Sequence, residues 1–178
     1  GLRLADGSLH ELDVLILATG FDACTGPLLA MNITGQDGVT LNEAWADGPA
    51  TYLGLTVSGF PNFYMITGPQ SPSVLYNMPL AIEDHVDFIA ELLQHMEQQA
   101  YESVVAGTLA QEQWVEETNA LAEMTLLPGS TTSWYMGANI PGKPRRVLVY
   151  LGGAPRYRAF CDEIVADNYR GFAFQGES

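Results

Sequence analysis

Small residues end an aliphatic run near the start of the chain, where a ligand could approach the backbone. Four large aliphatic residues at positions 14–17 are followed directly by Ala18, Thr19 and Gly20. Apolar side chains on both faces predict a buried strand, and small residues at the carboxyl end of such a strand let a ligand come close. Small residues also occur where a strand simply ends in a turn, so a ligand site and an ordinary strand end both stay open as interpretations.

A loop that leads into a helix is the second candidate. Apolar residues recur every three or four positions and predict a helix over about residues 79–98. The stripe consists of Ile82, Val86, Ile89, Leu93 and Met96. Asn77 is a residue type that caps helices, and Pro79 suits a first turn. The start of such a helix offers free backbone N–H groups and a positive dipole end, which would stabilise negative charge.

A polar loop over residues 126–146 is the third candidate, because loops of this length are usually functional or mobile. Its Trp134 has an indole donor that can lie over a nucleotide and bond its ribose; the alternative is a hydrophobic anchor for the loop. Asn139 and Lys143 share the loop. Lys143 could meet a phosphate, although a solvated lysine is the plainer interpretation.

Other reactive residues do not form a recognisable site. The three histidines, at positions 10, 85 and 95, lack metal-ligand spacing and cysteine partners, so we expect each to be a surface or packing residue and predict no metal. Cys24 and Cys161 are expected to be free thiols in a reducing cytoplasm. No GxSxG motif supports a hydrolase.

The charge distribution is uneven and acidic. The net charge is −14, and no Lys or Arg lies between Arg3 and Lys143. A basic face for nucleic acid or for anionic lipid is therefore absent, and no apolar run is long enough to span a membrane. The pattern indicates either a solvated acidic surface or an acidic piece of a protein whose basic segment lies elsewhere.

The remaining patterns predict a mixed α/β chain. Residues 2–20 read as two strands around the Asp6-Gly7 turn. Residues 21–58 read as a connection with short strands, and residues 62–67 as a buried strand. A second helix is predicted from Thr108, with a capping box to Gln111, to about Met124. The runs "VLVYLGG", "YRAFCDEIVADN" and "RGFAF" predict a strand, a short helix and a closing strand.

Several stretches together resemble one family of flavoproteins. They are "DGSLHELDVLILATGF", "TYLGLTVSGFPNFYMITGPQSP", "NMPLAIEDHVDFI" and above all "SWYMGANIPGKPR". The family is the Baeyer–Villiger monooxygenases of the cyclohexanone and phenylacetone monooxygenase type. The resemblance implies an α/β fold that is the C-terminal fragment of a flavoprotein with two Rossmann-like dinucleotide-binding domains, for FAD and NADP.

The resemblance also implies a division of the chain. Residues 1–20 would end the NADP-binding domain, and residues 21–58 would connect back to the FAD domain. Residues 59–100 would be the C-terminal part of the FAD-binding domain, and residues 101–178 a helix, the mobile loop at about 126–146 and closing strands. The chain starts at Gly1 in what reads as the middle of a domain. The N-terminal part of the same polypeptide would supply both GxGxxG turns, absent here, and the active-site arginine.

The family reaction converts ketones to esters or lactones with NADPH and O₂. NADPH reduces FAD, O₂ adds at flavin C4a, and the resulting peroxide attacks the ketone; the protein positions and polarises these groups. The alternatives are an N- or S-oxygenating flavin monooxygenase, or a non-catalytic fragment. We expect the isolated 178 residues to be inactive and to contain no catalytic residue of their own.

The resemblance assigns cofactor roles to a few positions. Met78 and Asn77 would contact FAD, although Met78 could instead be core filler, and Trp134 would contact NADP. Thr19 and Gly20 would lie near the nicotinamide.

Asp22 would lie with Thr19 and Gly20 near the nicotinamide, or would cap a turn. The resemblance places other residues around the ketone. Leu75 and Tyr76 would line the ketone pocket. Gln70 and Tyr76 depart from the Gly and Ser common in the family, which leaves the substrate range open.

Overall fold

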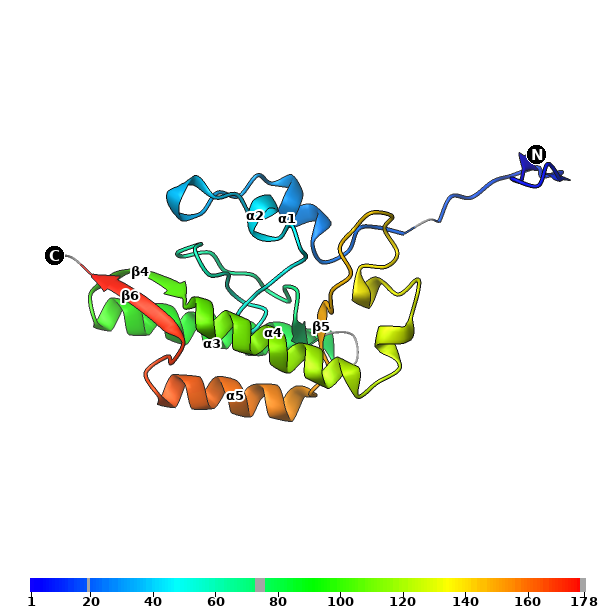
Figure 1. Ribbon diagram of the computed structural model, residues 1–178. Coiled ribbons are helices and arrows are strands. Elements are labelled where there is room, and N and C mark those ends of the chain that lie inside the picture. Colours follow the sequence, from blue (N-terminus) through cyan, green and yellow to red (C-terminus); the bar gives the residue numbers. More distant parts are fainter. Residues whose placement is uncertain (19, 73–75, 177–178) are drawn as a thin grey trace.

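The computed structural model describes residues 1–18, 20–72 and 76–176. Helices and strands alternate along them, as the predicted α/β class requires (Figure 1). The strands are β1 (Leu2–Arg3), β2 (Leu9–His10), β3 (Ser71–Pro72), β4 (Tyr101–Ala106), β5 (Val149–Tyr150) and β6 (Phe172–Gly176). The α-helices are α1 (Gly26–Ala30), α2 (Leu41–Ala44), α3 (Met78–Gln98), α4 (Thr108–Glu123) and α5 (Ala154–Ala166), and the 3₁₀ turns are η1 (Gln36–Gly38), η2 (Leu127–Gly129) and η3 (Trp134–Met136).

The main core lies between the three long helices and an antiparallel ribbon. β4 and β6 pair from Tyr101–Gly176 to Ala106–Phe172, and α3 packs against both β4 and α5. Trp114 and Tyr157 are buried at the centre. The helices α1 and α2 form an upper layer and α5 a lower one (Figure 1). The large rings are buried in the cluster that α3, α4 and α5 share, while α2 packs in a separate cluster around Leu41 and Trp45.

The N-terminal segment forms the predicted hairpin but not the predicted buried strand. β1 and β2 pair antiparallel around Gly7, whose φ is 87°. Residues 14–17 are in no strand, and Val14, Ile16 and Leu17 are 74%, 82% and 78% exposed. In Figure 1 this segment extends away from the body of the molecule. The prediction of a buried strand was wrong, because a strand with two apolar faces needs neighbours on each side and no strand among the described residues pairs with this segment.

The bounds predicted for α3 are confirmed. The predicted stripe is confirmed only for Met96, which is buried, and Ile89, which packs against the core. Ile82, Val86 and Leu93 are 40%, 48% and 46% exposed. The buried side chains are Ala81, His85, Phe88, Leu92 and Met96. The buried face is therefore rotated by about one residue, because the apolar arc of this helix is wide and its pattern does not say which edge meets the core.

The predicted bounds of α4 are also confirmed, whereas its predicted capping box does not form. Gly107 is the N-cap. The Thr108 hydroxyl lies 2.9 Å from the Ser58 hydroxyl, and Gln111 Oε1 accepts from the Ser58 N–H at 2.8 Å. A partner distant in sequence therefore replaces the local bonds of the capping box.

Two other segments predicted as strands adopt turns and short helices. Residues 21–58 contain α1, η1 and α2 with isolated bridges. Residues 62–67 form no strand, since Asn62 and Thr67 have φ values of 54° and 53°. Both values lie in the left-handed region, which interrupts extended backbone.

A short parallel pair joins the two halves of the chain. β3 pairs with β5 so that Ser71 lies opposite Val149. The predicted strand in "VLVYLGG", the helix α5 and the closing strand β6 are confirmed. No helix among the described residues has the length and apolar content needed to cross a membrane.

Candidate functional site

Met78 and Trp134, which were predicted to contact the two cofactors, line the same pocket. Its volume is about 320 Å³. The lining residues are Cys24, Pro27, Thr67, Gly68, Ser71, Pro72, Met78, Trp134, Leu148 and Val149. The pocket therefore lies where four segments meet: the chain just after the N-terminal tail, the β3–β5 pair, the start of α3, and the loop 126–146.

The start of α3 forms one wall. Met78 is the first helical residue, and Asn77 is the N-cap but makes no side-chain capping bond. Pro79 follows and has no N–H to satisfy. Among the described residues the helix start beside the pocket has no side-chain cap, and a helix start carries the positive end of the helix dipole. This arrangement suits negative charge on a flat ring more than a cationic group.

The opposite wall is held close to the backbone of Gly54. A Cβ at Gly68 would lie 2.5 Å from the Gly54 carbonyl oxygen. A Cβ at Gly54, whose φ is 72°, would lie 2.4 Å from the Ser71 Cβ. Neither position can accept a side chain without displacing this wall, because contacts below 3 Å do not occur between real Cβ atoms and their neighbours.

Gln70 fixes the same wall from behind. Its side-chain Oε1 accepts from the Thr51 N–H at 2.9 Å and from the Thr51 hydroxyl at 3.0 Å, and the Trp114 indole donates to its carbonyl at 3.1 Å. Gln70 is fully buried at a φ of 67°, a conformation that favours glycine. Gln70 therefore serves the packing behind the pocket and is not a lining residue.

His85 holds the adjoining residue of this wall. Its Nδ1 accepts from the Thr67 N–H at 2.9 Å, and its ring lies edge-on to Tyr157 at 5.6 Å between centroids. Burial lowers the pKa of His85 to about 4, against an opposing effect of Asp84. The imidazole is therefore neutral at neutral pH, as its acceptor role requires. The expectation of a packing residue is confirmed for His85.

Trp134 lines the pocket, and Met136, two residues later, anchors the loop. Met136 is 8% exposed and packs with Ala122, Val147 and Val149. The Trp134 ring is half-buried and lies 4.2 Å from the Tyr135 ring between centroids. The anchoring of the loop thus falls to Met136, and Trp134 remains available to a ligand.

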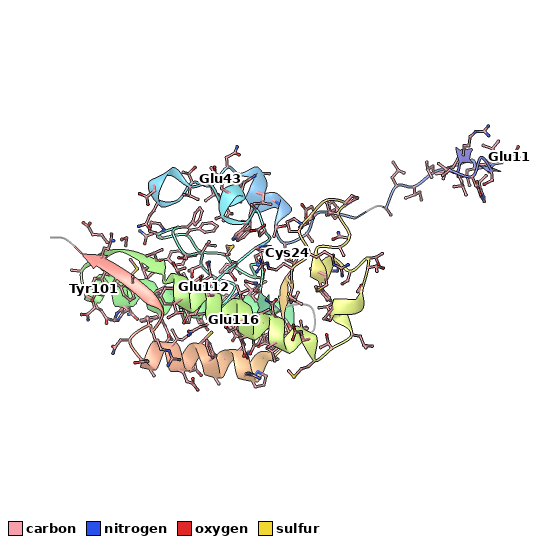
Figure 2. All side chains as sticks on the ribbon, in the orientation of Figure 1. Glu11, Cys24, Glu43, Tyr101, Glu112 and Glu116 are labelled. Carbon is pink, nitrogen blue, oxygen red and sulfur yellow. The ribbon has the colours of Figure 1, made fainter. Side chains whose placement is uncertain are left out.

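Two contacts tie the loop to the chain after the N-terminal tail. Lys143 forms an ion pair with Asp22, and the Asn139 amide donates to the Phe21 carbonyl at 3.3 Å. The Lys143 side chain is only 10% exposed, so the expectation of a solvated lysine was wrong. Figure 2 shows Cys24 where the tail enters the body of the molecule. Burial raises the pKa of the Cys24 thiol, which Lys143 partly offsets.

Two further predicted residues among the described ones, Gly20 and Tyr76, do not line the pocket. Thr19 and Leu75 lie outside the described residues. Gly20 is exposed with a φ of 82° and does not line the pocket. The Tyr76 hydroxyl donates to Asp84 at 2.9 Å, away from the lining residues. Cofactor and substrate roles for these four positions stay predictions.

Several lining residues were not singled out by sequence reasoning. Thr67 and Gly68 follow an apolar run much as Thr19 and Gly20 do, and this similarity could have found them. Cys24 and Ser71 carry no comparable signal, because their place depends on the pairing of β3 with β5 and on the path of the linker.

The chemistry of the lining suits uncharged rings. No Lys or Arg is among the lining residues of the described chain, and Lys143 is already paired with Asp22. Phosphate groups normally need cations or glycine-rich helix starts. A flavin or nicotinamide ring, with an apolar face and polar edge, fits Met78, Trp134, Ser71 and the helix start better than a phosphate would.

A larger hollow of about 790 Å³ lies between α4, α5 and β6. It contains none of the predicted site residues, and the Arg156–Glu117 ion pair occupies its edge. We therefore place the candidate site in the smaller pocket, where residues predicted independently converge.

Known proteins similar to this chain are flavin-dependent monooxygenases, although no family model matches it. It is 41% identical to a cyclohexanone 1,2-monooxygenase of Acinetobacter sp over 98% of this chain and 32% of that protein. It is 42% identical to an acetone monooxygenase (methyl acetate-forming) of Gordonia sp. (strain TY-5), over 97% and 32%. A crystal structure of cyclohexanone monooxygenase from Rhodococcus sp. Phi1 bound to NADP⁺ superposes with a TM-score of 0.91, at 40% identity, over 97% of this chain and 32% of that one.

The fold is thus that of part of a Rossmann-type flavoprotein monooxygenase. Along nearly its whole length the chain is homologous to the Baeyer–Villiger monooxygenases of the cyclohexanone monooxygenase type. It spans about a third of the length of these relatives.

Proposed function

We propose that the polypeptide containing this chain is a Baeyer–Villiger monooxygenase that converts ketones to esters or lactones with FAD, NADPH and O₂. The observation that carries this proposal is the convergence of Met78 and Trp134, distant in sequence, on one pocket beside the start of α3. The relatives' names, which include cyclohexanone and acetone monooxygenases, point to the same reaction.

Within the pocket, the chain's residues have distinct tasks. The N-terminus of α3 would stabilise negative charge on the reduced ring system, because it carries the positive end of the helix dipole and has no side-chain cap among the described residues. Met78 packs on the ring, and Trp134 covers the second nucleotide. Bound FAD supplies the oxygen-activating chemistry, and NADPH supplies the electrons. The loop 126–146, held by Met136, excludes water from the reaction.

The remaining assignments extend the same proposal. Residues 1–20 complete the NADP-binding domain, residues 21–58 connect it to the FAD domain, and residues 59–100 belong to that domain. Residues 101–178 add α4, the loop 126–146 and the closing strands. Asn77 borders the flavin, Thr19 and Gly20 border the nicotinamide, and Leu75 and Tyr76 belong to the segment that borders the ketone. The free thiols of Cys24 and Cys161 suit a reducing cytoplasm.

The test is a product assay with the longest native polypeptide that contains the chain. We expect it to consume NADPH and O₂ with FAD bound, and to convert cyclohexanone to its lactone. A matched reaction with a thioether separates S-oxygenation from ketone oxygenation. Sulfoxide without any lactone would contradict the proposal and favour an S-oxygenating enzyme. The 178-residue chain alone, with added FAD, should not oxidise NADPH.

A further inference from the structure

A cluster of three side chains links α5 to the residues that precede α3. Arg158 Nε donates to both carboxylate oxygens of Asp84, at 2.8 and 2.9 Å. The Tyr76 hydroxyl donates to Asp84 Oδ2 at 2.9 Å and accepts from Arg158 Nη2. The Arg158 guanidinium carbon also lies 5.4 Å from the centre of the Tyr76 ring. The hydroxyl of Tyr76 is thus saturated, with one bond donated and one accepted.

Tyr76 can influence the placement of Met78 through the backbone that joins the two residues. It lies two residues before Met78, which lines the pocket, while its own side chain points to Asp84 and Arg158 instead. The usual device that fixes the lead-in to a helix is a side-chain cap, and Asn77 makes none. Among the described residues, the tie from Tyr76 to Asp84 takes the place of that cap.

The cluster contributes to the placement of the start of α3 more than to the stability of the fold. The side chains of Arg158 and Asp84 are 44% and 21% exposed, and ion pairs that exposed contribute little to folding. The planar guanidinium nevertheless fixes the orientation of the Tyr76 side chain, because it donates hydrogen bonds to both the Asp84 carboxylate and the Tyr76 hydroxyl. Loss of the cluster should therefore change how the start of α3 is held much more than whether the protein folds.

We propose that the Asp84–Arg158 ion pair is a positioning device: through the Tyr76 hydroxyl it sets the placement of Met78 and hence the orientation of the ketone in the pocket. The proposal rests on the proposed function for its substrate, and on the contacts above for its mechanism. Asp84, Arg158 and Tyr76 act as positioning residues, since none of them lines the pocket.

The test uses the FAD-loaded, full-length polypeptide with Tyr76→Phe, Arg158→Met and the double variant. The matched control is Arg156→Met, on the same helix but paired with Glu117 at the other hollow. The first readout is the enantiomer ratio of the lactone formed from racemic 2-methylcyclohexanone, which a merely structural role would not move. We expect each single variant to shift the ratio at least threefold, the double variant to add nothing further, and Arg156→Met to leave the ratio unchanged.

A second readout does not depend on turnover. The Ala81 amide donates to the Asn77 carbonyl at 3.0 Å, and its hydrogen exchange should become at least tenfold faster in Tyr76→Phe and Arg158→Met, with thermal midpoints close to that of the wild type. Unchanged exchange in both variants overturns the positioning proposal, and so does an unchanged ratio in an enzyme that makes lactone. If the wild type makes no lactone but exchange speeds up as expected, the proposed function fails while the positioning of Met78 stands.

Discussion

Trp134 and Met136 lie two residues apart in one loop, and their surroundings give them different tasks. Met136 packs with Ala122, Val147 and Val149, whereas Trp134 is half-buried at the rim of the pocket. A side chain that binds a ligand must leave part of its surface uncovered in the free protein, while an anchor must not. The two residues therefore offer a matched comparison of binding with stability.

Replacement of Met136 by Ala should lower the free energy of unfolding by about 2–4 kcal/mol, because a buried side chain is lost and a cavity remains. Trp134→Ala should lower it by less than about 1 kcal/mol but raise the KM for NADPH several-fold in the active polypeptide. Urea unfolding and steady-state kinetics check both. Equal loss of stability in the two variants, with NADPH kinetics unchanged by Trp134→Ala, would make Trp134 a second anchor.

His85 makes stability depend on pH in a defined window. The pKa of His85 is about 4 in the folded chain, against an ordinary 6.5. Between pH 4 and pH 6.5, His85 is therefore protonated in the unfolded chain and neutral in the folded chain. Stability is therefore full above pH 6.5 and falls as the pH drops toward 4, by roughly 3 kcal/mol from this group.

Urea unfolding at pH 7 and pH 5 checks this expectation, with His85→Gln as the comparison. Gln has no titration in this range and keeps an acceptor for the Thr67 N–H. Its pH dependence should be weaker than wild type, whereas substitution of the exposed His10 should change nothing. An identical pH dependence in wild type and His85→Gln would show that other groups carry the effect.

At the residue scale, Met78 and Trp134 were singled out from the helix start, the polar loop and the family resemblance. The structure brings them to one pocket, and their cofactor roles stay predictions. Lys143 was misjudged because its partner, Asp22, is distant in sequence, and nothing local announces such a pair. Cys24 and Ser71 were missed for the same reason.

At the scale of elements, α3 connects the core to the site. Its first residue lines the pocket, and His85, farther along the helix, holds Thr67. Its core face contains Phe88 and Leu92. The sequence predicted its length well, because Pro79 and the apolar period are local signals. Which edge of the apolar arc is buried depends on β4 and α5, and the sequence does not encode that locally.

Leu92 and Leu93 are adjacent leucines that test this orientation directly. Leu92 is 0% exposed and Leu93 is 46% exposed. In the folded chain, Leu92→Ala should cost about 3 kcal/mol through lost burial and a residual cavity, and Leu93→Ala less than about 1 kcal/mol. Chemical unfolding of both variants measures the difference. A larger loss for Leu93→Ala would restore the stripe expected from the sequence.

The loop 126–146 depends on its ties to the linker. Lys143→Met removes the ion pair with Asp22 and with it the nearly buried cation that ties the loop to the linker. We expect limited proteolysis within the loop to become several-fold faster. Arg170→Met, which removes an exposed pair with Asp167, is the control and should not change the cleavage rate. Equal rates in wild type and Lys143→Met would show that the ion pair does not hold the loop.

At the scale of the whole molecule, the largest difference from expectation is the N-terminal tail. The aliphatic run at residues 14–17 has the composition of a buried strand and is exposed in the structure. The chain spans about a third of the length of its relatives. The family and the mixed α/β architecture could be predicted, because the motifs extend along most of the chain. The burial of each segment could not be predicted, because burial is a property of all the strands and helices that pack together.

The fluorescence response of Trp134 to NADP⁺ would test directly whether the cofactor pocket lies between Met78 and Trp134. Trp45 and Trp114 are 4% and 2% exposed and do not line the pocket, so Trp134 should report the ligand. In the FAD-loaded, full-length polypeptide, NADP⁺ should quench tryptophan emission in wild type, and Trp134→Phe should abolish most of the change. The same quenching in both proteins, or none in wild type, would contradict the placement of the cofactor pocket between Met78 and Trp134.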